Sequence, residues 1–188
     1  MSTKFVLFML FLVAPMILAA TDTTQTATMP KHGFVGVQVC KMCHHTDKQG
    51  KQFDIWQSSK HAQAYKTLET DEANKIAKEK GFSTPAAKTP ECLKCHVSGY
   101  GVEASLIGPK FNMEDGVQCE TCHGPGADYK TLKIMKDKKL AIENGLQMHD
   151  NLDTFCATCH NSESPTFKKG ADFKKMWEQI KHPVPESK

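Results

Sequence analysis

The stretch CETCHGPG, Cys119 to Gly126, holds two cysteines three positions apart, a histidine directly after the second, and then Gly-Pro-Gly. Three kinds of site use such residues: structural zinc, a redox dithiol and a covalently attached haem. The Cys-x-x-Cys-His pattern occurs four times, and the copies contain all eight cysteines of the chain. The copies are Cys40-Lys-Met-Cys43-His44, Cys92-Leu-Lys-Cys95-His96, Cys119-Glu-Thr-Cys122-His123 and Cys156-Ala-Thr-Cys159-His160.

Haem attachment explains both the spacing and the histidine. Two cysteines three residues apart on a helical turn point to one side, where their thiols can add to the two vinyl groups of one haem. The histidine that follows lies under the ring and can bind the iron. Tetrahedral zinc and a disulfide framework give no reason for a histidine after every pair. Redox dithiols of the thioredoxin kind would need four βαβ units, which this sequence lacks. We therefore predict four haem c groups on the eight cysteines, with His44, His96, His123 and His160 as proximal ligands.

The apolar composition points the same way. Residues 21–188 contain only 27 leucines, isoleucines, valines and phenylalanines, or 16% of 168 residues. This fraction is below the level at which a chain of this size normally builds its own core. Net charge is small, which is not typical of a disordered chain. A bulky apolar cofactor would supply the missing interior.

The first residues have the pattern of a secretory signal. Lys4 precedes an uncharged apolar run, Phe5 to Leu18, followed by the small pair Ala19-Ala20. The run is shorter than a membrane-spanning helix, so we expect cleavage after Ala20 and no transmembrane anchor after processing. The predicted organisation is a signal peptide at 1–20, a flexible polar lead-in at 21–35 and one tetrahaem domain at 36–188. The mature protein is then periplasmic or extracellular.

The charged residues argue against a nucleic-acid partner. All basic residues are lysines, whereas bidentate recognition of bases and phosphates favours arginine. A cluster such as Lys136, Lys138 and Lys139 is typical of a solvated helix face. The sharper alternative is a docking patch for an acidic redox partner protein.

The motifs recur after 52, 27 and 37 residues, which argues against tandem repeats and for one irregular domain. Helices are expected over 53–68, from Thr70 to Gly81, over 127–140 and over 171–181. No run alternates clearly enough for a strand. The predicted fold class is mainly α: a small multihaem cytochrome in which helices and long loops wrap around four covalent haems.

The order of motifs resembles the tetrahaem cytochrome c-554 family. Trp56 to His61, then CHVSGYG (Cys95 to Gly101), then CETCHGPG, then CATCH follow the family order over about residues 40–182. The resemblance implies a largely helical fold with closely stacked haems that pass single electrons. It also implies distal ligands: His61 on the third haem, opposite His123, and His182 on the fourth, opposite His160.

The resemblance assigns no histidine of this chain as the distal ligand of the first or second haem. In the family's best-known member the second haem is five-coordinate, and here residues 99–117 contain no histidine. The family places a ligand of the first haem shortly after CHGPG, but the matching stretch ADYKTLKIMKDKK contains no histidine. His149 is the first candidate to replace it. His45 is the second, because small tetrahaem cytochromes use a histidine beside a proximal one, and His32 could ligate locally or in a neighbouring molecule.

Electron transfer between redox partner proteins, in a respiratory or nitrogen-oxide-linked chain, is the leading functional hypothesis. Four haems exceed what a single-site enzyme needs, and bis-histidine ligation keeps iron low-spin. An alternative is reduction of nitric oxide or a similar small ligand at a five-coordinate haem. A third reading is self-association into a filament that conducts electrons. The carrier reading is favoured over an enzyme because no proton-handling cluster accompanies the motifs.

Overall fold

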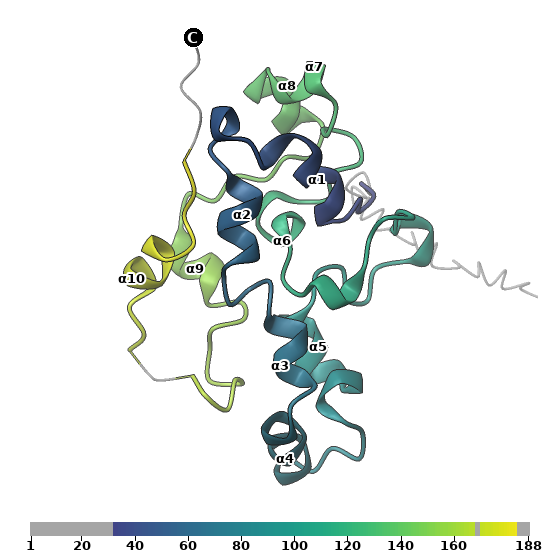
Figure 1. Ribbon diagram of the computed structural model, residues 1–188. Coiled ribbons are helices and arrows are strands. Elements are labelled where there is room, and N and C mark those ends of the chain that lie inside the picture. Colours follow the sequence, from purple (N-terminus) through teal and green to yellow (C-terminus); the bar gives the residue numbers. More distant parts are fainter. Residues whose placement is uncertain (1–31, 168–169, 184–188) are drawn as a thin grey trace, which may run out of the picture. The chain divides into compact units, whose positions relative to one another are not determined.

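The computed structural model describes residues 32–167 and 170–183 of the chain (Figure 1). These residues form short α-helices joined by long loops and 3₁₀ turns, and they contain no β-strand. An isolated parallel bridge pairs Phe34 with Ile107. The helices are α1 (Val37–His44), α2 (Gln52–Gln57), α3 (Ala64–Leu68), α4 (Asp71–Glu79), α5 (Pro90–His96), α6 (Cys119–His123), α7 (Leu132–Met135), α8 (Lys138–Glu143), α9 (Leu152–Cys156) and α10 (Phe173–Glu178). The prediction of a mainly α fold is confirmed.

The predicted signal peptide, and the lead-in up to residue 31, lie outside the described residues. The last lead-in residues are described and packed. Phe34 donates its N–H to the Leu106 carbonyl at 2.7 Å, and Val35 is buried. Within the described residues, no helix has the length and apolarity needed to span a bilayer.

The expected helix over 53–68 is broken, and this part of the prediction was wrong. α2 ends at Gln57, α3 begins at Ala64, and the turns between them carry His61. Ser58 Oγ donates back to the Asp54 carbonyl, a contact that competes with helix continuation. Val117 donates its N–H to the His61 carbonyl at 3.0 Å, so a distant loop takes the place of the next helical turn.

The expected helix over 127–140 is also divided. α7 covers only Leu132–Met135, and α8 starts after Asp137, whose side chain accepts the Leu140 N–H at 3.0 Å. An aspartate that caps a new helix ends the previous one, which explains the interruption. The helix expected over 171–181 is present but shorter, as α10, with Asp172 as its cap.

The helix opened by Thr70 is confirmed as α4, and its cap supports a quantitative prediction. Thr70 Oγ1 accepts the Ala73 N–H at 3.2 Å. Thr70→Ala should therefore lower the free energy of unfolding by about 1 kcal/mol, measured by denaturant titration. The matched control is Thr131→Ala, because Thr131 precedes α7 without a side-chain cap bond. Equal losses in both variants would contradict the capping argument.

The apolar core of the described chain is small. Ten apolar residues are buried: Val35, Val37, Phe53, Ala62, Leu68, Ala77, Ala86, Val97, Tyr129 and Ala141. The one cluster formed by buried residues contains Leu68, Ala77 and Ala86, with partly buried neighbours from α4 and α5 around it. Four alanines among ten buried residues leave much of the described chain without side chains large enough to fill an interior.

Candidate haem-binding site

The four Cys-x-x-Cys-His motifs lie at the ends of short helices. α1 and α5 end at His44 and His96, α6 is itself the third motif, and α9 ends at Cys156, with Cys159 and His160 in the turns that follow. None of the eight cysteines forms a disulfide. In the described residues, no three His, Cys, Asp or Glu side chains converge as a bare metal-ion site would require.

Contacts between cysteines of different motifs show which motifs lie next to each other. The Cys40 and Cys119 thiols are hydrogen-bonded, which lowers the pKa of Cys40 and raises that of Cys119. Burial, and then the neighbouring Cys159 thiol, raises the pKa of Cys95 to about 11. Burial, and then the charges of Cys156 and Cys159, likewise raises the pKa of Cys122 to about 11. The first motif therefore adjoins the third, the third adjoins the fourth, and the fourth adjoins the second.

The structure pairs the histidine rings differently from the sequence expectation. The ring centres of His123 and His182 are 5.8 Å apart, and those of His61 and His160 are 6.1 Å apart. The expectation placed His61 opposite His123 and His182 opposite His160, so the two partners are exchanged. The α2–α3 turns direct His61 to the fourth motif, and the segment after α10 brings His182 to the third.

These separations fit an iron atom between the two rings of each pair. A first-row metal binds an imidazole nitrogen at about 2 Å, so two imidazoles on opposite sides of one metal have ring centres roughly 6 Å apart. Nδ1 of His182 is buried and has no hydrogen-bond partner among the described residues. Both ring pairs therefore have the spacing of axial ligands of a haem.

The histidines of the second and first motifs each have a partner at Nδ1. Nδ1 of His96 lies 2.8 Å from the Ala64 carbonyl oxygen, and Nδ1 of His44 lies 3.3 Å from Oε1 of Gln52. A hydrogen bond at Nδ1 fixes the ring orientation and leaves Nε2 available to a metal. Gln52 also donates to the Pro183 carbonyl at 3.0 Å, which links the first motif to the residue after His182.

The three candidates for the first haem lie in different environments. His149 is engaged: Nε2 lies 2.6 Å from the Cys122 carbonyl oxygen, and the ring stacks on Phe155 with centres 3.7 Å apart. His45 is exposed at the end of α1. His32 is held by Asp128, with Nδ1 2.6 Å from the carboxylate. Across 32–167 and 170–183, no histidine ring pairs with His44 or with His96.

Burial keeps the paired histidines in the form that binds a metal. It lowers the pKa of His123 to about 4, with a further contribution from His182, His149 and His44. Burial also lowers the pKa values of His61, His160 and His182. Only a neutral imidazole has a free lone pair for iron, so the ligating form of these side chains persists to lower pH than in free histidine.

Gly124, the first residue of the Gly-Pro-Gly after the third motif, is required by close packing. Gly124 has a φ of +75°, and a Cβ there would lie 2.7 Å from the Gly145 carbonyl oxygen. Only glycine adopts this conformation at such a distance without strain. The turn allows the Gln147 N–H to reach the His123 carbonyl at 2.9 Å, and Tyr129 donates its hydroxyl to the Gly124 carbonyl at 2.7 Å.

Sequence reasoning missed the buried polar residues around the third motif. Gln118 is buried; its Oε1 accepts the Val37 N–H at 2.8 Å, and its amide donates to the Asn112 carbonyl at 2.8 Å. Glu120, inside the motif, is buried as well. Nothing in the spacing of the motif signals that Glu120 points inward, because its partners come from residues 35, 36 and 126.

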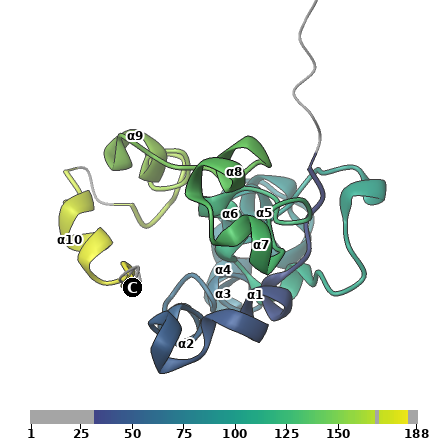
Figure 2. The ribbon, with the colours of Figure 1, turned by 90° about the horizontal axis from the view of Figure 1, so that it is seen from above.

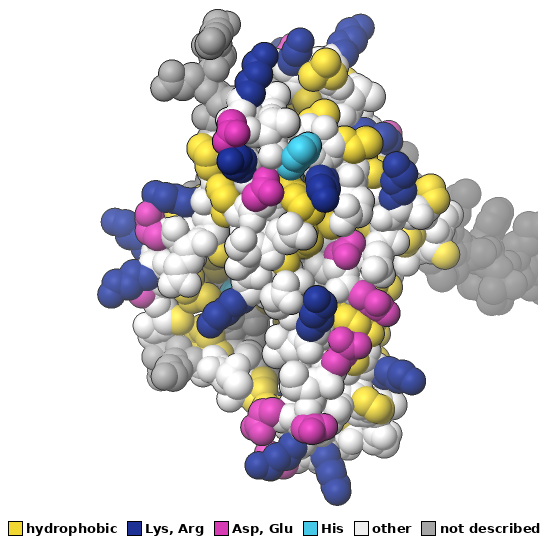
Figure 3. All heavy atoms as spheres, viewed as in Figure 1, with side chains coloured by type: hydrophobic (Ala, Val, Ile, Leu, Met, Phe, Trp, Pro, Cys, Tyr) yellow, Lys and Arg dark blue, Asp and Glu magenta, His cyan; other side chains and the backbone are white. Residues whose placement is uncertain are grey.

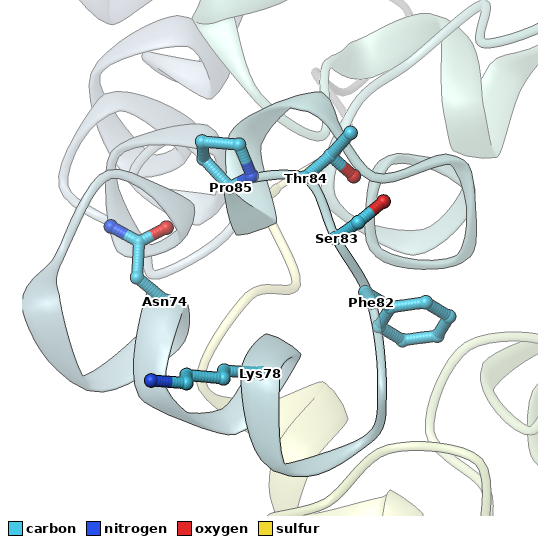
Figure 4. Close-up of a pocket in the computed structure, with 6 residues that line it drawn as sticks. All are labelled: Asn74, Lys78, Phe82, Ser83, Thr84 and Pro85. Atoms are coloured by element: carbon cyan, nitrogen blue, oxygen red, sulfur yellow. The ribbon is translucent and has the colours of Figure 1, made fainter.

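Two further surface features do not contribute to this site. A pocket of about 370 Å³ beside α4 is lined by Asn74, Lys78, Phe82, Ser83, Thr84 and Pro85, and contains neither cysteine nor histidine (Figure 4). On the face shown in Figure 3, lysine and acidic side chains are interspersed, as on an ordinary solvated surface. Figure 2 shows α9 beside α10. α9 ends at the first cysteine of the fourth motif, and α10 precedes His182.

Comparisons with known proteins show which proteins this chain is similar to. Residues 39–124 match the family model described as cytochrome c554 and c-prime. Cytochrome c-554 of Nitrosomonas europaea is 31% identical over 155 residues, an alignment that covers 73% of this chain and 62% of that protein. The chain thus spans less than two thirds of the relative's length.

A solved structure supports the fold. The reduced state of cytochrome c554 from Nitrosomonas europaea matches with a TM-score of 0.50 at 24% identity, covering 76% of this chain and 72% of that one. The helical fold found here is therefore that of cytochrome c554. The resemblance to the cytochrome c-554 family, first seen in the motif order, is confirmed by these matches.

Proposed function

We propose that this relative of cytochrome c-554 is an exported c-type cytochrome that carries single electrons between redox partner proteins. The observation that carries the proposal is the pair of histidine ring contacts, at 5.8 and 6.1 Å, each built on a Cys-x-x-Cys-His motif. An electron carrier needs redox centres that change little in geometry when they gain an electron, and bis-histidine haem meets this need.

The residues present fit four haem c groups. The eight motif cysteines would form the thioether bonds, and the four motif histidines would bind iron on the proximal side. His182 would complete the third haem, and His61 the fourth. Each haem supplies a one-electron couple when bound. The chain would hold the histidine ligands in place and keep water away from the paired rings.

The finer assignments extend this proposal. Residues 1–20 would direct export and be removed, and residues 36–188 would form one tetrahaem domain in the periplasm or outside the cell. The donor and acceptor would belong to a respiratory or nitrogen-oxide-linked chain. The filament alternative draws no support from His32, because its ring is bonded to Asp128 of the same chain.

A second candidate function is binding and reduction of nitric oxide or a similar small ligand. The observation that favours it concerns His44 and His96: in the described parts of the chain neither ring faces a second histidine, in contrast to His123 and His160. An iron with only a proximal ligand keeps one coordination position for a small molecule.

Low-temperature electron paramagnetic resonance of the oxidised protein tests both functions. We expect two low-spin irons, from the third and fourth haems, and high-spin signal from the first and second. Carbon monoxide should shift the Soret band of the reduced protein in proportion to the high-spin fraction. Four low-spin irons and no carbon monoxide shift would leave electron transfer as the function and remove the ligand-reduction candidate. High-spin iron at the third or fourth haem would contradict the ligand assignment.

A further inference from the structure

The carboxylate of Glu120 is the most unusual charged group in the described chain. Glu120 stands between the two cysteines of the third motif and is only 2% exposed. Its Oε1 accepts the N–H groups of Val35 at 2.9 Å and Gly126 at 2.6 Å, and its Oε2 accepts the N–H of Gly36 at 2.8 Å. Both carboxylate oxygens thus accept backbone N–H groups, and no contact requires a proton on the carboxyl group.

Within the described residues, no lysine or histidine forms an ion pair with Glu120. The lysine–carboxylate pairs found there join exposed side chains, and the His32 pair is made with Asp128. Removing a carboxylate from water is costly, and backbone N–H groups offset that cost without neutralising the charge. The field of Glu120 therefore reaches its surroundings with little screening by solvent.

The surroundings of Glu120 are the first and third motifs. Glu120 follows Cys119 directly, and its Oε2 binds Gly36, whose carbonyl lies 3.9 Å from the Cys40 sulfur. α1, which carries the first motif, packs against α6, which is the third motif.

We propose that Glu120 is a fixed negative charge that lowers the reduction potentials of the first and third haems below those of the second and fourth. A ferric haem carries one more positive charge than a ferrous haem, so a nearby buried anion stabilises the oxidised form. The second and fourth motifs, which adjoin through Cys95 and Cys159, have no such buried carboxylate among the described residues. The inference rests on the proposed haem attachment, and it gives electron flow a direction, from the first and third haems to the second and fourth.

The experiment is a potentiometric titration of the holoprotein, followed by electron paramagnetic resonance and absorbance. Glu120→Gln should raise the two lowest potentials and leave the two highest nearly unchanged. Glu163→Gln is the matched control, because this exposed carboxylate lies near Cys95 and is bonded to Lys94 at 2.5 Å. Water and salt screen its charge, so its removal should shift the potentials less. Equal shifts in the two variants would overturn the proposal.

A second substitution separates charge from structure. Glu120→Asp keeps the negative charge but shortens the side chain, so it weakens the backbone contacts while the potentials stay close to those of the unmodified protein. Equal shifts in the Gln and Asp variants would assign the effect to lost packing and overturn the proposal. Unchanged potentials in a folded Glu120→Gln protein would overturn it directly.

If Glu120→Gln fails to mature, the unmodified protein still tests the idea. Salt screens exposed charges but not a buried one, so the two lowest potentials should move less between low and high ionic strength than the two highest. Uniform movement of all four would overturn the proposal. A pyridine haemochrome assay, which counts covalent haems, separates failure of the proposed function from failure of this inference. Protein without covalent haem would refute both. Four covalent haems with unshifted potentials would refute the inference alone.

Discussion

Replacing His61 with alanine is expected to convert the fourth haem to high spin and leave the third haem low-spin. The His61 and His160 rings are 6.1 Å apart, so His61 would be the distal ligand of the iron that His160 binds. Without it that iron keeps one protein ligand and takes water or a small molecule. His182→Ala should do the same to the third haem, opposite His123. The effect is the loss of one full low-spin signal in each variant.

The measurement is the count of low-spin irons by electron paramagnetic resonance, with absorbance of each haem during reductive titration. His149→Ala is the control, because His149 is bonded to the Cys122 carbonyl and faces no proximal histidine at 6 Å. It should retain both low-spin signals. If His61→Ala instead removed the low-spin signal of the third haem, the pairing of His61 with His160 would be contradicted. The pairing of His61 with His123, expected from the sequence, would then hold.

Residues 21–188 produced without haem attachment are expected to show no cooperative thermal unfolding. In the part of the chain that the structure describes, four of the ten buried apolar residues are alanines, and the buried residues form a single cluster of Leu68, Ala77 and Ala86. Burying roughly 400 Å² of porphyrin surface contributes on the order of 10 kcal/mol, which is comparable to the whole stability of a domain. Loss of the haems should thus remove most of the folding free energy.

Circular dichroism during heating measures this directly. The haem-loaded protein should unfold in one sharp transition, and the haem-free chain should lose its helical signal gradually from low temperature. The control is a haem-free chain in 2,2,2-trifluoroethanol, which regains helical signal without regaining cooperativity. A sharp transition of the haem-free chain at the temperature of the haem-loaded protein would show that side chains alone build the core.

The parts of the fold that sequence reasoning predicted correctly depend on local contacts. Thr70 caps α4 with a bond to Ala73 three residues away, and the mainly helical class follows from such short-range patterns. The break between α2 and α3 was missed because it depends on a distant loop: Trp56 donates its indole N–H to the Val117 carbonyl at 2.8 Å, beside the His61 contact. Periodicity within a window of residues carries no information about that loop.

The site divides in the same way. Each motif is complete within five residues, so the proposed attachment points and proximal ligands could be read directly from the sequence. The histidines outside the motifs could be counted from the sequence. Which motif each one faces depends on the path of the chain after α2 and after α10. Glu120 escaped notice for a related reason, because residues 35 and 36, which bury it, are about 85 positions earlier in the chain.

The distance along the chain between the paired histidines has one more consequence. His61 and His160 are about 100 residues apart and His123 and His182 about 60, so an iron held between each pair would close a large loop, much as a disulfide does. Each closure would tie the C-terminal third of the polypeptide to an earlier part and restrict the unfolded chain. Acid or a competing ligand that opened one such tether would then release a whole segment, so that the integrity of the fold would depend on iron ligation.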